Sequence, residues 1–302
     1  MKPCGPIETL WPVACDACNR WEACGWWEEC AVHYVASMNR YRVQYYLRNG
    51  EQMKPLSLLV SGVFMLTSLA VASAQQPAFR IATDINFGDD KAPAKQSLTL
   101  FSEGVFYDFS LDDPNEIAII DPQQDRIVLL DIKRSIKTTI DTIELAKYVD
   151  AAKQQAASTD LALLIAAANS VSFDETSGAI NVGIEQMHYH STIQEPQDPR
   201  MATQYADFAN WSARLNAVYP PYRPPYVRMR LNDELGSRNL LPREIVLTKS
   251  VGGKAEKARC RLIADWQLTK EDLARIKGVN QKLQQFNELS TSLYFAQQKP
   301  RK

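Results

Sequence analysis

The segment FRIATDINF, residues Phe79–Phe87, sets the pattern from which the fold of this chain follows. Its odd-numbered positions are apolar apart from Thr83, and they alternate with mainly polar ones, which is typical of a β-strand with one buried face. Two pairs of apolar runs follow, residues 98–101 with 105–109 and residues 117–120 with 127–132, around the turn sequences SEG and DPQQD. The sequence therefore predicts an antiparallel meander of about five strands.

Helix signals follow the meander. Asp141 and Asp198 are side chains that cap helix N-termini, and Thr269 with Asp272 has the spacing of a capping box. The run LALLIAAAN, residues 161–169, is almost wholly apolar and predicts a helix buried on most sides. Its length is about half of what a membrane span requires. The helix after Thr269 is amphipathic, with apolar positions up to residue 289, and we expect it to lie on the sheet.

Strand patterns alternate with these helices. We expect one hairpin formed by residues 171–173 and 179–193, and a second formed by residues 244–248 and 258–268. Apolar and basic side chains alternate over residues 227–231, so this segment also reads as a strand. The fold class predicted is α+β: a curled antiparallel β-sheet, shaped as an incomplete barrel-like meander and packed with about four helices.

Residues 53–74, MKPLSLLVSGVFMLTSLAVASA, have the three-part pattern of a secretory signal peptide. Lys54 supplies the positive end, an apolar run follows, and Ala72 and Ala74 are the small residues that a signal peptidase accepts. Cleavage would leave Gln75 as the first residue. We therefore expect residues 75–302 to form a single exported domain, periplasmic or secreted, that meets the membrane only during export.

Residues 1–52 allow three interpretations. They are an upstream extension if translation begins at Met53, or a short cytoplasmic segment if the apolar run stays in the inner membrane as a signal-anchor. Basic residues precede that run, so both interpretations place residues 75 onward outside the cytoplasm. The third is a zinc site built from the cysteines and histidine of this segment: Cys15, Cys18, Cys24, Cys30 and His33.

The charge balance excludes a strong electrostatic attraction to polyanions. Residues 1–74 hold 6 of the 34 basic and 6 of the 35 acidic side chains, which leaves 28 basic and 29 acidic side chains downstream. A nearly neutral exported domain is not expected to bind nucleic acid. No cofactor is expected either, because the sequence holds no dinucleotide, phosphate-loop or HExxH motif.

His188 and His190 are the histidines of the exported part and lie two residues apart in a predicted strand. Side chains at i and i+2 share one face of a strand, and such pairs can contribute two imidazoles to a metal site. On one continuous strand both would project to the face of Ile180, Val182 and Ile184. The alternative interpretation is a pair of solvated or hydrogen-bonded imidazoles at the end of a strand.

Two further features have a structural and a functional interpretation. The proline-rich connector YPPYRPPY begins at Tyr219 and ends at Tyr226, and it either links a helix to a strand or docks an envelope protein. Its aromatic and basic residues, together with Arg228 and Arg230, either form a solvated strand face or bind sugars or a polyanion. Cys260 lies on the apolar face of its strand, which predicts a packed, inert thiol.

The order of elements, with the turns SEG and DPQQD and the closing strand sequence LPREIVL at residues 241–247, resembles the LolA/LolB-like family of periplasmic lipoprotein carriers and their exported relatives. The resemblance covers residues 79–268 and is architectural. It implies an incomplete barrel with helices against its concave face and acyl chains held in an apolar cavity. No binding residue carries over.

Three functions follow as hypotheses. The leading one is a non-enzymatic exported protein that binds an apolar or amphipathic ligand, such as a lipid or acyl chain, or an envelope component. The second is an extracytoplasmic hydrolase or metal-binding protein that uses His188 and His190. The third is a structural or interaction module of the envelope that docks through residues 219–226.

Overall fold

One curved sheet organises the chain in the computed structural model, which describes residues 76–155, 161–219, 223–251 and 254–296. The sheet has 12 strands in the order β12-β6-β5-β4-β3-β2-β1-β11-β10-β9-β8-β7. Its two edges, β12 and β7, do not pair with each other, so the barrel is open. The predicted fold class, α+β with a curled and incompletely closed antiparallel sheet, is confirmed; only the pairing of β12 with β6 is parallel.

The first half of the sheet is the predicted meander. Its turns have the backbone that their residues favour: Glu103 and Gly104 both have positive φ, of 55° and 79°, as a two-residue type I′ turn requires. Asp125 also has positive φ after the short 3-10 helix η1 (Pro122–Gln124). The meander has one strand more than expected, β6, and comprises β1 (Phe79–Phe87), β2 (Lys95–Ser102), β3 (Val105–Ser110), β4 (Glu116–Asp121), β5 (Arg126–Asp131) and β6 (Ile136–Asp141).

The second half joins the first through β11, which pairs with β1. Antiparallel pairing continues outward from β11, so strands distant in sequence become neighbours in the sheet. The strands of this half are β7 (Val171–Asp174), β8 (Ala179–Ile184), β9 (Met187–Gln194), β10 (Leu241–Val251) and β11 (Lys254–Asp265). The two-residue strand β12 (Asn287–Glu288) lies at the opposite edge.

The continuous strand predicted for residues 179–193 is wrong. The chain reverses at Glu185 and Gln186, and β8 pairs back onto β9 with Ile184 opposite Met187. Gly183 permits the reversal because its φ is 129° and a Cβ there would collide with the Met187 carbonyl. Glu-Gln is not a sequence that favours a tight turn, so the residue types at 185 and 186 did not predict the reversal.

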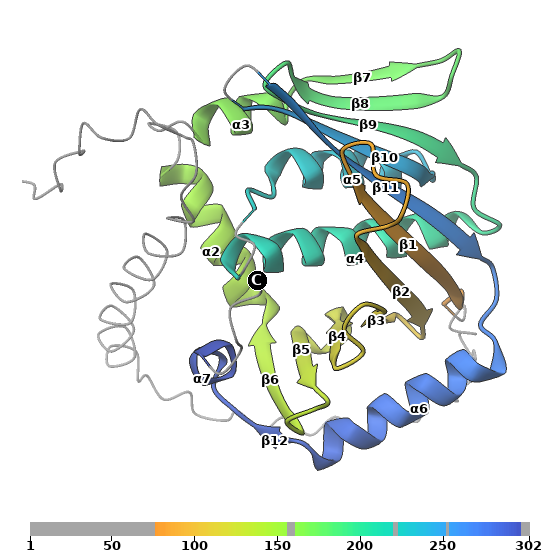
Figure 1. The fold of residues 1–302 in the computed structure, drawn as a ribbon, viewed down its shortest axis with the longest axis vertical. Helices are drawn as coiled ribbons and strands as arrows, with labels where there is room; N and C mark the ends of the chain where they lie inside the picture. The colour runs from red at the N-terminus through yellow and green to blue at the C-terminus, as the bar shows by residue number, and fades with distance from the viewer. Residues whose placement is uncertain (1–75, 156–160, 220–222, 252–253, 297–302) are drawn as a thin grey trace, which may run out of the picture. The chain divides into compact units, whose positions relative to one another are not determined.

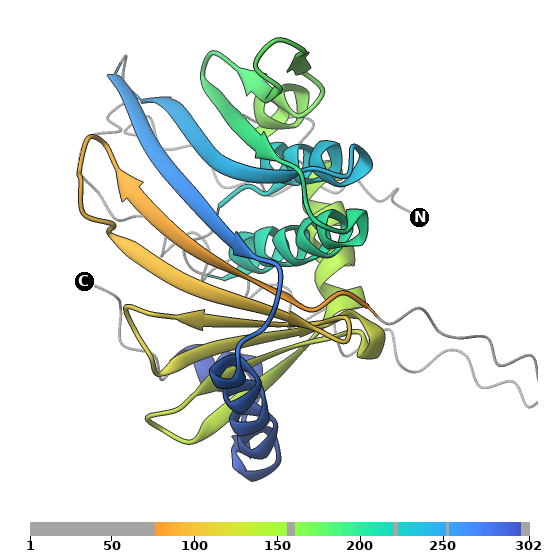
Figure 2. The same cartoon turned by 90° about the vertical axis from the view of Figure 1, so that its right-hand side faces the viewer.

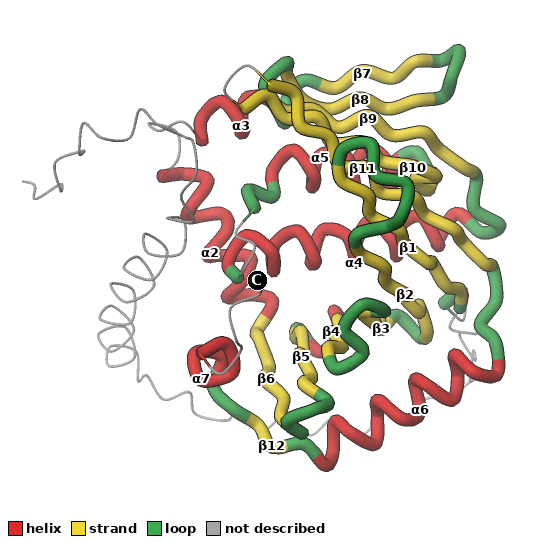
Figure 3. Tube along the Cα trace, in the orientation of Figure 1, coloured by secondary structure: helices red, strands yellow, loops and turns green. Residues whose placement is uncertain are grey.

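Helices cover both faces of the curved sheet (Figures 1 and 2). The concave face receives α4 (Pro199–Val218) and α5 (Tyr226–Ser237), which run beside the strands in Figure 3, with α2 (Thr142–Gln155) and α3 (Leu161–Ala167) next to them. The convex face receives α6 (Lys270–Gln285), and α7 (Thr291–Ala296) follows. The predicted caps are confirmed: Asp141 accepts from the Glu144 N–H at 3.0 Å, and Asp198 from the Arg200 N–H at 2.9 Å.

Residues 227–231 are helical, so the strand predicted there is wrong. Val227, Leu231 and Leu235 are spaced by four and all buried, which places them on one side of α5. The apolar residues at 227, 229 and 231 fit either period over so short a stretch. The prediction that α3 is buried on most sides is also wrong, since Leu163 in its centre is 58% exposed.

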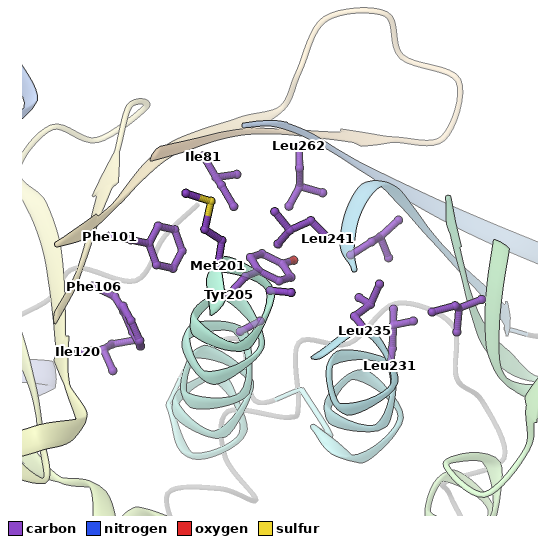
Figure 4. Packing of buried hydrophobic residues seen from close by; sticks show 14 of the residues in the cluster. Ile81, Phe101, Phe106, Ile120, Met201, Tyr205, Leu231, Leu235, Leu241 and Leu262 are labelled. Atoms are coloured by element: carbon purple, nitrogen blue, oxygen red, sulfur yellow. The ribbon is translucent and has the colours of Figure 1, made fainter. Parts of the chain in front are cut away.

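The concave core is built around aromatic rings. Phe79 and Phe101 stack with centroids 4.1 Å apart, and Phe208 of α4 meets Phe101 edge-on at 5.7 Å. Figure 4 shows Phe101, Ile81 and Leu262 pointing from the arching sheet toward the helices, where Tyr205 projects back. This interface between sheet and helices is the larger of the two cores.

The convex core lies under α6, on the opposite side of the same strands. Leu100 packs there although its neighbour Phe101 belongs to the concave core, because successive side chains point to opposite faces. Val279 is the buried residue of α6 at this contact. The prediction of an amphipathic helix on the sheet is confirmed, except that the helix ends at Gln285 and leaves Leu289 outside it.

None of the helices in the described part of the chain is long and apolar enough to cross a membrane. The predicted signal peptide with Ala72, Ala74 and Gln75, and the cysteine-rich segment before it, lie outside the described residues.

Candidate ligand cavity

A cavity of about 270 Å³ lies between the concave face of the sheet and α4. Strands β1, β2, β9, β10 and β11 form one wall, and α4, α5 and the residues between these two helices form the other. Much of its lining is apolar, with side chains that include Ile81, Phe101, Phe208, Ile245 and Leu262. Figure 4 shows Ile81, Phe101 and Leu262 projecting from the strands toward the helices.

The cavity has a polar and accessible end. Phe87 at the end of β1 is 39% exposed, and Asn216 and Arg223 on the helical side are also exposed. These three residues line the cavity, so its mouth lies beside them. Accessible apolar surface next to a polar rim is the usual arrangement of a small-molecule site.

Arg228 is the charged side chain of the cavity that stands among neutral aromatic neighbours. Its Nη2 donates to the Tyr205 hydroxyl at 2.9 Å, and its guanidinium lies 6.0 Å from the centre of the Tyr189 ring. Burial raises the pKa of both Tyr205 and Tyr189, so both phenols are neutral at pH 7. Burial by itself would lower the pKa of Arg228, but Tyr205, Cys260 and Tyr189 raise it overall. Arg228 is therefore a permanent cation.

Cys260 also lines the cavity, where it is half-buried and not in a disulfide. Burial raises the pKa of its thiol, and the nearby Arg228 offsets this only in part. A thiol with a raised pKa is largely protonated at neutral pH and reacts slowly. The apolar strand face predicted for Cys260 is therefore also a wall of the cavity.

Asp108 lies beside the sheet wall of the cavity. Its carboxylate accepts from the Thr99 hydroxyl at 2.8 Å, and Thr99 lines the cavity. Burial raises the pKa of Asp108 to about 6, although the Thr99 hydrogen bond acts in the opposite direction. Nothing in the sequence distinguished Asp108 from other acidic residues on strands.

His188 and His190 lie on the convex face, so their predicted projection with Ile180 and Val182 is wrong. Across the β8–β9 pair His190 is opposite Asn181 and His188 is opposite Gly183, whereas Val182 is opposite Tyr189. The undetected turn between β8 and β9 breaks the alternation, which shifts the parity of the second strand. His190 shares a hydrogen bond of 2.8 Å between its Nδ1 and Asn181 Oδ1. Within the described ranges no group of three or more potential metal ligands forms around them.

The basic and aromatic residues of segment 219–230 do not form one surface. Tyr226 is buried and donates to the Val149 carbonyl at 3.2 Å, Arg228 lines the cavity, and Arg230 is exposed and pairs with Glu234 at 2.7 Å. The predicted solvated strand face is thus replaced by a helix with separate environments. Arg223, Pro224 and Pro225 of the connector line the cavity, and residues 220–222 lie outside the described residues.

The place of Arg228 in the cavity wall could not be predicted while residues 227–231 were expected to form a strand. The spacing of Val227, Leu231 and Leu235 by four was the signal for a helix, and a helix places Arg228 next to the buried side.

No protein-family description matches the sequence, and no curated protein matches it as a relative.

Proposed function

We propose that residues 75–302 form an exported, non-enzymatic binding protein whose concave cavity holds an apolar or amphipathic ligand. One observation carries the proposal: a cavity of about 270 Å³ lies between sheet and helices, with apolar inner walls and an accessible end beside Phe87 and Arg223. Well-packed interiors leave few spaces larger than a water molecule, so a space of this size favours a ligand site over ordinary core packing. The pattern of residues 53–74 supports export.

The chemistry around the cavity favours binding over catalysis. Cys260 is the thiol at its wall, and the pKa of that thiol is raised by burial, which is opposite to what a nucleophile needs. His188 and His190 lie on the other face of the sheet. The hydrolase hypothesis would therefore place its two histidines on the face of the sheet opposite to this cavity.

The size of the cavity favours a ligand with one chain. A water molecule occupies about 30 Å³ in the liquid, and a methylene group is similar in size, so the cavity accommodates roughly nine methylene groups. The resemblance to lipoprotein carriers implies a lipid anchor with several acyl chains, which is larger. A single medium-length alkyl chain is accordingly the ligand class that we propose.

Ala213 offers a direct test because it is buried in α4 and lines the cavity. The protein expressed from the full reading frame should bind a fluorescent single-chain acyl probe. Ala213→Leu puts three more carbon atoms into the cavity, and we expect at least a tenfold loss of probe affinity with retained helix and strand content. Ala217→Leu, four residues further along α4 and outside the cavity lining, is the matched control and should bind as the wild type does. Equal probe binding by both variants would contradict the proposal.

A further inference from the structure

We propose that the ligand of this cavity carries a carboxylate at one end of its single alkyl chain, and that Arg228 binds that carboxylate. The inference rests on the proposed function and goes beyond it, because it assigns the head group of the ligand and the residue that recognises it. The observation behind it is a guanidinium in the wall of a largely apolar cavity that has no acidic partner among the described residues.

Arg228 has hydrogen-bonding capacity to spare. A guanidinium has five N–H donors, and in the described part of the chain its hydrogen bond is the one from Nη2 to the Tyr205 hydroxyl. None of the described acidic side chains forms an ion pair with it, whereas Arg80, Arg126 and Arg134 of the same fold each pair with an aspartate. The other groups that act on Arg228 are Tyr189 and Cys260, and both are neutral at pH 7.

Arg228 is half-buried, so its charge is partly removed from water with no acidic partner among the described residues. Removing a charge from water without an opposite charge is unfavourable, and proteins ordinarily avoid it by pairing the group. The Tyr205 hydroxyl and the Tyr189 ring compensate part of this cost, as a hydrogen bond and a cation–π contact do. A bound anion would supply the remaining compensation, so the unpaired state favours an anionic ligand over a neutral one.

The geometry suits a carboxylate in particular. A planar guanidinium presents parallel donors that match the two oxygens of a carboxylate. The Tyr205 hydroxyl accepts from Arg228 and keeps its own hydrogen available, so it can donate to the same carboxylate. The two groups come from neighbouring helices, α4 and α5, and both line the cavity.

The rest of the cavity wall suits the chain of such a ligand. From Arg228 and Tyr205 the lining continues to Phe101, Phe208 and Leu262, which are apolar and partly shown in Figure 4. Arg223 is exposed at the mouth, where a second positive charge raises the local concentration of anions. A carboxylate on roughly nine methylene groups would therefore fill the space and satisfy the cation.

Decanoate and decanol test the inference, because they differ at the head group and have chains of the predicted length. Calorimetric titration of the full-length protein at pH 7.5 should show decanoate binding at least tenfold more tightly than decanol. Arg228→Met keeps most of the side-chain length and removes the charge, so it should bind both ligands equally. Arg228→Lys should keep a preference for decanoate. Arg230→Met, on the exposed side of α5, is the matched control and should behave as the wild type.

The outcomes separate this inference from the proposed function. If the wild type binds decanol as tightly as decanoate, or if Arg228→Met keeps the preference for decanoate, the assignment of the head group is overturned while the apolar cavity remains a binding site. If the wild type binds neither ligand, the inference and the proposed function both fail. Circular dichroism of each variant checks that the loss of preference does not come from unfolding.

Discussion

The two faces of the sheet bury similar apolar side chains but differ in whether their charged groups have partners. On the convex face α6 packs directly on the strands, and its buried Asp272 is paired with Arg80 at 3.1 Å and with the Thr269 N–H at 2.9 Å. On the concave face a cavity remains, Arg228 has no acidic partner among the described residues, and Asp108 accepts one hydrogen bond, from Thr99. The buried charge under α6 is therefore paired, whereas the two charged groups beside the cavity have no partner of opposite charge among the described residues.

Truncating the concave core should have the largest effect on stability. Phe101 is fully buried, stacks on Phe79 and contacts Phe106 and Phe208. Phe101→Ala removes these contacts and enlarges the existing cavity, so we expect a loss of about 3–5 kcal/mol in the free energy of unfolding. Urea unfolding followed by circular dichroism measures it. Phe87→Ala, at the exposed mouth, is the control; a comparable loss there would contradict the assignment of Phe101 to the core.

Removing the buried carboxylate of Asp272 on the convex face should lower the free energy of unfolding by a smaller amount. The side chain of Asp272 is 2% exposed and closes the capping box of α6. Burial alone would raise the pKa of Asp272, but the Thr269 N–H and Arg80 lower it overall. Asp272→Ala leaves Arg80 without this partner and α6 without its cap, and we expect a loss of about 2–3 kcal/mol at pH 7.

The same substitution predicts a pH dependence and has a matched control. Because the pKa of Asp272 is lowered on folding, its contribution is present above the ordinary aspartate pKa of 3.8 and is lost as the pH falls below it. The control is Asp265→Ala, which removes the other partner of Arg80, a carboxylate whose side chain is 61% exposed. Exposed pairs contribute little, so this loss should stay below about 1 kcal/mol. Equal losses for the two variants would mean that α6 is not held by its buried cap.

Replacing Asp108 should change the free energy of unfolding least, and should increase it where the other substitutions decrease it. Its pKa in the folded protein is about 6, above the ordinary 3.8, so the folded state holds the proton more strongly and stability falls as the pH rises across this interval. Asp108→Asn keeps an acceptor for Thr99 and removes the charge. We expect a gain of about 1–2 kcal/mol at pH 8 and almost none at pH 3.5. Thermal unfolding at the two pH values measures the difference, and a gain that is the same at both would contradict burial of an ionised carboxylate.

The sequence predicted the meander and the helix starts because these depend on local chemistry. The strand from Phe79 to Phe87 follows from the alternation of its own residues. The helix starts follow from side chains that bond to N–H groups two or three residues further along, namely those of Asp141, Asp198 and Thr269. The parity of β9 could not be predicted in this way. It depends on the turn at Glu185 and Gln186, which their types do not announce, and one missed turn reversed the face assigned to His188 and His190.

The cavity could not be predicted from the sequence, for a different reason. Its walls come from β1, β2, β9, β10, β11, α4 and α5, which the chain brings together through long-range pairing such as that of β1 with β11. The pattern of residues 227–231 fits a strand as well as a helix, and only packing against β8 and α4 decides between them. Arg228 therefore emerged as a candidate ligand-binding residue only when its neighbours were in place.

Native mass spectrometry of the protein recovered from the extracytoplasmic fraction would detect a ligand in the concave cavity. We expect a polypeptide that begins at Gln75 and carries one additional small mass, which dissociates on activation as an acidic single-chain amphiphile. The Ala213→Leu protein should lack that mass, and the Ala217→Leu protein should retain it. Wild-type polypeptide of the same length with nothing bound, which also fails to take up decanoate when it is added, would contradict the claim that the concave cavity is a ligand site.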